Sequence, residues 1–222
     1  MKNKIPLSIG LYDSRFEHDS CGVGFVCDIQ GRRSNTIITQ GFAVLEHLAH
    51  RGAVGSDPNT GDGAGILIQI PHEFFNNVAG SLGISLPGPG YYATGLIFLP
   101  QDKGERSYCK EAFNEVVKEY GQVLLGWRVV PTDSSSIGDG AKSTQPVFEQ
   151  VFIARNKEIK DQLEFERKLY VIRKSIENIV SSSDLKEKRS FYITNISSRT
   201  FSYKGLLMPA QLQKFFLDFK DP

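Results

Sequence analysis

Residues 19–25 read Asp-Ser-Cys-Gly-Val-Gly-Phe and place a cysteine directly before an alternating segment. Apolar and other residues alternate from Val23 onward, which predicts a β-strand that ends at Gly31. A cysteine at the start of a strand and followed by glycines has an accessible thiol, and a ligand can approach the backbone closely. Cys21 is therefore the first candidate for a chemical role.

The nitrogen atom of Cys21 decides how its thiol could be activated. If the chain is cut between Ser20 and Cys21, the new N-terminus carries an α-amino group, and the pKa of such a group is about 7.7–8.0. That amine could accept the thiol proton near neutral pH, as in N-terminal nucleophile enzymes. An internal Cys21 has no base beside it in the sequence. The local sequence alone favours the plain alternative, a small buried cysteine at a strand start.

The rest of the chain alternates between strand and helix patterns. Ile38, Phe42, Leu45 and Ala49 form one helical stripe, with Asn35 as the expected N-cap and Gly52 as the end. Residues 52–65 are rich in Gly, Asp, Asn and Pro and predict a loop. Strands are predicted at 66–70, 91–99, 123–130, 147–154, 191–196 and 200–203, the last two as a hairpin or bent pair. Helices are predicted from Pro71, at 108–120 and 161–180, and from Pro209. This mixture predicts buried sheets covered by helices.

Composition excludes several classes of protein. The 222 residues include 26 Lys and Arg against 25 Asp and Glu, so a nucleic-acid partner is not expected. The apolar runs are too short for a membrane span, and residues 1–20 lack the apolar core of a secretory signal. We therefore expect a cytoplasmic protein. Three cysteines without a Cys-x-x-Cys pair predict neither a disulfide framework nor a zinc site.

Other motifs favour structural roles. The glycines at 61, 63 and 65 precede a strand and not a helix, which argues against a phosphate cradle. His47 and His50 have a spacing that can bind metal, but no Cys or carboxylate partner is spaced nearby, so no metal site is expected. Cys27 is expected in the core, and Trp127 is expected to pack.

Three motifs in register resemble one known family. They are Cys-Gly-Val-Gly-Phe at 21–25, His-Arg-Gly-Ala at 50–53 and Thr-Gly-Asp-Gly-Ala-Gly-Ile at 60–66. Their order and spacing resemble the N-terminal glutaminase domain of glutamate synthase, a class II glutamine amidotransferase, over at least residues 11–75. The resemblance implies an α+β fold with four α/β/β/α layers of the N-terminal-nucleophile type, incomplete at the C-terminus. It also implies a propeptide-like leader at 1–20 and a partial amidotransferase domain at 21–222.

The same resemblance implies roles for individual residues. Cys21 would be the nucleophile, freed by removal of the 20-residue leader, with Gly22 beside it. Arg51 would lie next to the nucleophile, and a second reading of Arg51, as a cation at a helix C-terminus, is compatible with this. Residues 51–59 would form a mobile segment that closes over the glutamine site. The residues implied near the site are Gly52, Asp57, Gly61, Asp62 and Gly63.

Two further motifs of the family do not occur in this sequence. They are Asn-Gly-Glu-Ile-Asn, which supplies the oxyanion donors, and His-Ser-Arg-Phe-Ser-Thr, whose Arg holds the substrate carboxylate. The resemblance therefore implies a fragment that is inactive by itself and holds no cofactor. In a full-length parent it implies L-glutamine as substrate and a synthase domain with FMN and an iron–sulfur cluster. That domain would use the released ammonia to aminate 2-oxoglutarate, with a small electron-delivering subunit as a further partner.

Two alternatives compete with this interpretation. One is a non-enzymatic regulatory or binding module that kept the amidotransferase fold. The other is a Cys–His hydrolase in which an internal Cys21 works with His47, His50 or His72. The second leaves the leader and the Cys-Gly-Val-Gly spacing unexplained, so the glutaminase interpretation is favoured.

Overall fold

The computed structural model describes residues 21–55 and 57–221, and their strands form two antiparallel sheets. The leader predicted at 1–20 lies outside the described residues. One sheet pairs β1 (Ala64–Gln69) with β6 (Thr200–Gly205). The other has four strands in the order β3 (Val123–Val129), β4 (Val147–Ala154), β2 (Tyr92–Leu99) and β5 (Tyr192–Ile193).

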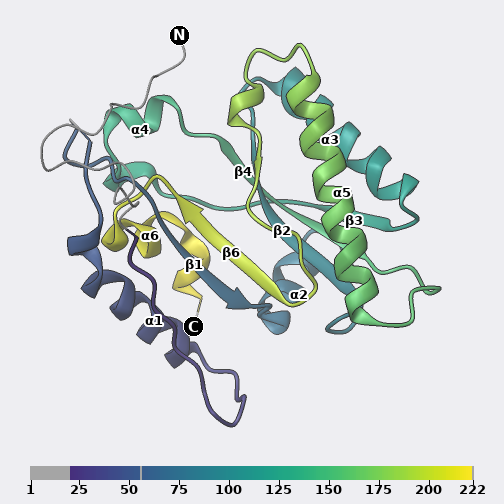
Figure 1. The fold of residues 1–222 in the computed structure, drawn as a ribbon, viewed down its shortest axis with the longest axis horizontal. Coiled ribbons are helices and arrows are strands. Elements are labelled where there is room, and N and C mark those ends of the chain that lie inside the picture. Colours follow the sequence, from purple (N-terminus) through teal and green to yellow (C-terminus); the bar gives the residue numbers. More distant parts are fainter. Residues whose placement is uncertain (1–20, 56, 222) are drawn as a thin grey trace, which may run out of the picture.

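Helices cover both sheets, so the layers follow the predicted α/β/β/α order (Figure 1). The α-helices are α1 (Asn35–His47), α2 (His72–Gly80), α3 (Lys103–Glu119), α4 (Asp139–Ser143), α5 (Gln162–Ser182) and α6 (Pro209–Phe215). Short 3₁₀ turns are η2 (Ala49–Arg51), η3 (Ser134–Ser136), η4 (Lys188–Ser190) and η5 (Leu217–Lys220). From left to right, Figure 1 shows α1, the two-stranded sheet, the four-stranded sheet, and then α3 with α5. The α+β prediction is confirmed.

The two central strands of the four-stranded sheet, β2 and β4, are buried on both faces, as their continuous apolar runs predict. β2 and β4 pair from Tyr92↔Ala154 to Leu99↔Val147. Ile97 and Leu99 point to one face, where they pack with Phe113 of α3 and Leu169 of α5. All four side chains are fully buried, so this half of the molecule is a closed core.

A second core lies between the two sheets. Phe75 of α2 is at its centre, with ring centroids 5.1 Å from Phe201 of β6 and 6.1 Å from Phe152 of β4. Phe148 of β4 contacts Phe215 of α6 edge to face, at 5.5 Å. Aromatic contacts thus join helices and strands from both ends of the chain.

The strand predicted up to Gly31 is not formed. Residues 21–28 pair with no strand among those described, and Val23 is 89% exposed and Phe25 87% exposed. A strand needs a neighbour for its backbone groups, and alternation alone does not supply one. This segment instead runs over α1, where a Cβ atom on Gly24 would lie 2.5 Å from Val44. The prediction that Cys27 is in the core is also wrong, because Cys27 is exposed.

β5 and β6 do not form the predicted hairpin or bent pair, because they belong to different sheets. The chain first follows β2, where the Thr194 N–H donates to the Leu96 carbonyl at 3.1 Å. It then crosses β2 at Gly95, where an added Cβ would lie 2.1 Å from the Asn195 carbonyl oxygen. The missing side chain at this position lets the chain pass to β1.

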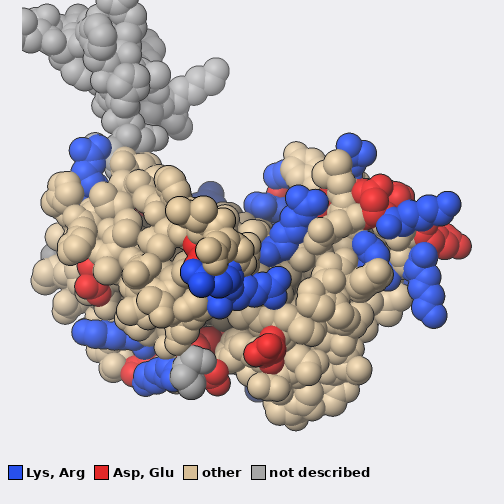
Figure 2. Space-filling model, turned by 90° about the horizontal axis from the view of Figure 1, so that it is seen from below, with Lys and Arg blue, Asp and Glu red and all other residues tan. Residues whose placement is uncertain are grey.

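The surface carries charges of both signs, and uncharged residues cover most of the face in Figure 2. Within residues 21–55 and 57–221, no helix is long and apolar enough to cross a membrane.

Candidate functional site

Gly22, the residue that follows Cys21, lies against the end of the first helical segment. A Cβ atom on Gly22 would be 3.1 Å from the Leu48 Cβ and 3.3 Å from the Arg51 Cβ and Cγ. The thiol of Cys21 and the side chain of Arg51 are both exposed. The structure therefore places Gly22, the residue that follows Cys21, against Arg51, which is 29 positions further along the sequence.

Arg51 is placed by a tightening of the helix at its end. The predicted single helix ends at His47, and its N-cap is Ser34 instead of Asn35. The chain continues as η2, where the Arg51 N–H donates to the Leu48 carbonyl at 2.8 Å. His50 Nδ1 lies 3.0 Å from the His47 carbonyl oxygen, so the two histidines interact within the turn.

Residues 52–55 and 57–63 form a closed loop beside Arg51. Its two arms are joined by the Gly55 N–H to the Thr60 carbonyl at 2.9 Å and by the Asp62 N–H to the Ala53 carbonyl at 3.1 Å. A Cβ atom on Gly52 would lie 3.2 Å from an oxygen of the Asp62 carboxylate. The loop leads directly into β1, as the sequence predicted. We call residues 52–55 and 57–63 the site loop.

Asp57 organises the tip of the site loop. Its carboxylate accepts the Asn59 N–H at 2.9 Å and the Thr60 hydroxyl at 3.1 Å. These donors, the Asn59 N–H first, lower the pKa of Asp57 below its ordinary value. The charged Asp57 carboxylate therefore stabilises the folded state at pH values above the pKa that Asp57 has in the unfolded chain. This stabilisation is lost as the pH falls through the lowered pKa of Asp57 in the folded state. The carboxylate also lies against Gly138, where any Cβ atom would overlap it.

Gly61 and Gly63 have separate structural reasons to be glycine. Gly61 is buried, and an added Cβ would lie 2.4 Å from the Leu207 carbonyl carbon and the Met208 nitrogen. Gly63 has a φ of 137°, which an L side chain rarely adopts. Gly61 thus serves close packing of the loop, whereas Gly63 serves its backbone conformation, and both roles are structural, as expected from the sequence.

We expect Gly61→Ala to destabilise the protein by about 1–3 kcal/mol, because backbone atoms at Leu207 and Met208 cannot move aside as a side chain can. Denaturant unfolding measures this change in the free energy of unfolding. Gly80→Ala is the matched control. Gly80 is the last residue of α2, and no atom lies within 4 Å of the methyl group that the substitution adds. Equal stability of Gly61→Ala and the control would contradict the close contact.

Gln211 of α6 also holds the site loop, and the sequence did not single it out. Its Nε2 atom donates to the Asn59 carbonyl at 2.9 Å and to the Ser136 carbonyl at 2.7 Å. Its Oε1 atom accepts the Met208 N–H at 2.8 Å. The side chain is only 4% exposed, so these bonds replace its contacts with water. The sequence offered one signal of a buried role for Gln211, because this glutamine lies among the apolar residues of a short predicted helix.

The other two cysteines do not share the environment of Cys21. Cys109 is fully buried in α3, and burial raises the pKa of its thiol to about 11, which keeps it protonated at neutral pH. Cys27 is exposed but lies outside the contact between Gly22 and Arg51. The described residues contain no group of three or more His, Cys, Asp or Glu that could hold a metal ion.

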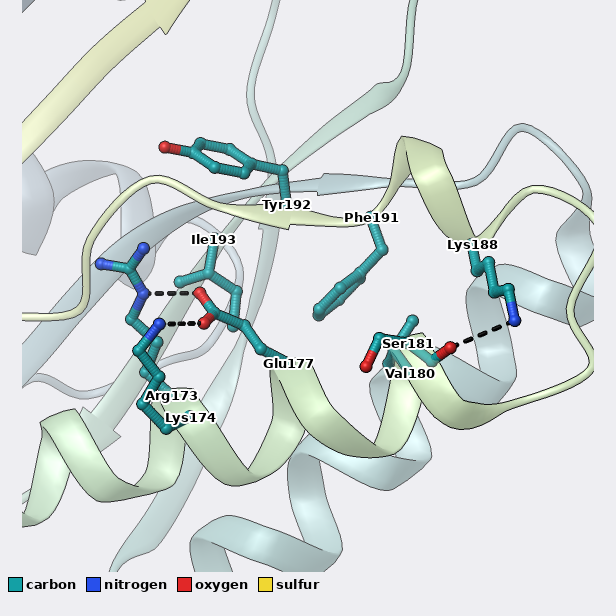
Figure 3. Close-up of a pocket in the computed structure, with 9 residues that line it drawn as sticks. All are labelled: Arg173, Lys174, Glu177, Val180, Ser181, Lys188, Phe191, Tyr192 and Ile193. Atoms are coloured by element: carbon teal, nitrogen blue, oxygen red, sulfur yellow. Dashed lines mark hydrogen bonds and ion pairs between the residues drawn. The ribbon is translucent and has the colours of Figure 1, made fainter. Parts of the chain in front are cut away.

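A surface hollow of about 380 Å³ lies away from this site, between α5 and β5 (Figure 3). Glu177 accepts from Arg173 and from Lys174, both at 2.7 Å. Burial opposes the charge of Glu177, but these two partners hold the pKa of its carboxyl below the usual value. Lys188 donates to the Ser181 carbonyl at the end of α5. Most charged side chains that line the hollow thus already bond to other groups of the same chain.

The model of the family described as class II glutamine amidotransferases matches residues 21–222. The chain belongs to the class II glutamine amidotransferases. The two sheets and their helices are therefore the N-terminal-nucleophile fold of this family, as the motifs predicted.

Relatives of this amidotransferase domain include glutamate synthases from bacteria, fungi and plants. The glutamate synthase [NADPH] large chain of Bacillus subtilis is 43% identical over 219 residues, which is 99% of this chain and 14% of that protein. The glutamate synthase [NADH] of Schizosaccharomyces pombe is 38% identical over 96% of this chain and 10% of its own length. Ferredoxin-dependent glutamate synthase 2, chloroplastic, of Arabidopsis thaliana is 35% identical over 95% of this chain and 13% of its own length. The chain thus spans 10–14% of the length of these relatives.

Proposed function

We propose that this domain hydrolyses L-glutamine to L-glutamate and ammonia through Cys21. The observation that carries the proposal is the exposed thiol of Cys21, whose neighbour Gly22 packs against Arg51. Residues 21–222 match the amidotransferase family, and the match begins at this cysteine. The burial of Cys109 adds support, because it removes one competing thiol.

The proposed reaction begins after hydrolysis of the Ser20–Cys21 peptide bond. The new α-amino group takes the proton from the Cys21 Sγ atom, and the sulfur attacks the side-chain amide carbon of glutamine. The C–N bond of the amide breaks, the protonated amine gives its proton to the leaving nitrogen, and ammonia departs. A thioester remains on Cys21. Water then attacks the thioester, which releases glutamate and restores the thiol.

Arg51 and the site loop have supporting roles in this proposal. The Arg51 guanidinium supplies a positive charge beside the nucleophile. The loop closes over bound glutamine, and Asp57 and Gln211 set its resting conformation through the bonds described above. Exclusion of water by such a loop keeps the reaction at the thiol productive.

In a longer parent protein, we propose that the ammonia passes to a synthase domain that aminates 2-oxoglutarate. The relatives that support this are named as glutamate synthases that use NADPH, NADH or ferredoxin. FMN and an iron–sulfur cluster would belong to that synthase domain, with a small electron-delivering subunit as a further partner. Whichever of these electron donors the parent protein uses, the proposed contribution of this domain is the hydrolysis of glutamine.

Labelling with a chloroketone analogue of glutamine tests the proposed function. We expect one equivalent of label on Cys21 in the processed full-length protein, located by peptide mass spectrometry, and protection by excess glutamine. A non-enzymatic module would take no protected label. Label that maps to Cys27 or Cys109 would contradict the assignment of Cys21.

A further inference from the structure

A buried ionic cluster joins the two sheets at some distance from the site. Arg128 of β3 donates from both terminal nitrogens to the Asp218 carboxylate of η5, at 2.9 Å and 2.5 Å. The side chains of Arg128 and Asp218 are 8% and 4% exposed. Tyr203 of β6 donates its hydroxyl to the same carboxylate at 2.6 Å. Burial and Asp218 raise the pKa of Tyr203 well above its ordinary value, so the hydroxyl keeps its proton.

The cluster is anchored in the centre of the four-stranded sheet. Arg128 also donates to the Gln150 Oε1 atom of β4 at 3.1 Å. Gln150 in turn donates to the Thr94 hydroxyl of β2 at 3.0 Å. Gln150 and Thr94 are fully buried. Asp218 and Tyr203 are therefore attached to a fixed point that spans three strands.

Asp218 and Tyr203 are also the two ends of the segment that supports the site loop. We call residues 203–218 the platform. The platform contains Leu207 and Met208, whose backbone fits against Gly61, and Gln211, which donates to the Asn59 carbonyl. No other part of the platform is tied to the four-stranded sheet by an ion pair among the described residues. The cluster thus fixes both ends of the platform on which the loop rests.

We propose that Arg128, Asp218 and Tyr203 position the site loop by fixing the platform at both ends. They are positioning residues, because none of them contacts the loop in the hydrogen bonds of the structure. The relevance of the cluster to glutamine rests on the proposed function, but its effect on the loop does not. A buried carboxylate that loses a donor is left short of a hydrogen bond, so removal of one member weakens the remaining bonds of the group.

Hydrogen exchange of the loop amides tests this inference without any measurement of activity. In the full chain, Tyr203→Phe removes one hydroxyl and keeps the ring packing. We expect the amides of Gly55, Thr60 and Asp62 to exchange about tenfold faster, because the loop opens more often when its platform is less firmly held. The amides of β2 and β4 should keep their protection. Asp218→Asn should act in the same direction.

Tyr120→Phe is the matched control. It also removes a half-buried tyrosine hydroxyl, which lies 3.2 Å from the Ser175 hydroxyl of α5 and contacts no residue of the platform. We expect this variant to leave loop exchange unchanged. The inference is overturned if the loop amides of Tyr203→Phe and Asp218→Asn remain as protected as those of Tyr120→Phe. It is equally overturned if both variants accelerate exchange in β2 and β4 as much as in the loop, because the cluster would then stabilise the whole core without a specific effect on the site.

Discussion

Replacement of Cys21 by Ala is expected to lower glutaminase activity of the processed full-length protein by about 10³-fold or more. The side chain that forms the thioester is then absent, and no other described cysteine can take its place. Cys109 is sealed in the core, and Cys27 lies outside the contact between Gly22 and Arg51. Ammonia release from glutamine at saturating concentration measures the loss.

Cys27→Ala and Cys109→Ala are the controls for this result. Cys27 is exposed, so its replacement should leave both activity and stability close to those of the original protein. Cys109→Ala should cost stability, because it opens a small cavity beside the fully buried core of α3, and should leave the activity of the folded protein unchanged. A loss of activity in Cys27→Ala equal to that in Cys21→Ala would contradict the assignment of the nucleophile.

A polypeptide of these 222 residues, with residues 1–20 still attached, is expected to release no ammonia from glutamine. The nitrogen of Cys21 is then part of a peptide bond and has no basic lone pair, which removes a general-base contribution of about 10²–10⁴-fold. The sequence also lacks the Asn-Gly-Glu-Ile-Asn segment of the family, and the loss of one oxyanion donor costs about 10²–10³-fold. The two losses need not multiply, because such groups act as a unit.

An ammonia assay on the purified 222-residue polypeptide tests this expectation, with Cys21→Ala as the reference for background. Equal, background-level rates in the two proteins agree with it. Ammonia release that disappears in Cys21→Ala would show that residues 1–222 already hold a base and oxyanion donors. Gln211 would not be the source of the oxyanion donors, because its side chain supports the loop. The donors would then have to be sought among the described residues near Arg51.

Local patterns were sufficient for the long strands of the four-stranded sheet and for the helix α5 that covers it, but not for β5, which has two residues where 191–196 were predicted. The predicted strand at 147–154 has the same bounds as β4, and the predicted helix at 161–180 differs from α5 by one residue at its start and two at its end. Such elements bury long apolar runs or stripes, and that signal is contained in the order of the residues. The motifs likewise determined which family the chain belongs to, and the resemblance to that family implied that Arg51 lies beside Cys21.

Long-range contacts decided what the sequence could not. Alternation at 22–31 predicted a strand, but a strand exists only where another strand lies beside it, and the structure places α1 there. The contact of Gln211 with Asn59 spans 152 positions, and that of Arg128 with Asp218 spans 90. No periodicity connects residues so far apart, because their meeting depends on how two sheets pack. The sequence by itself therefore determined the family and singled out Cys21 as the proposed nucleophile, whereas the support of the site loop was decided by tertiary structure alone.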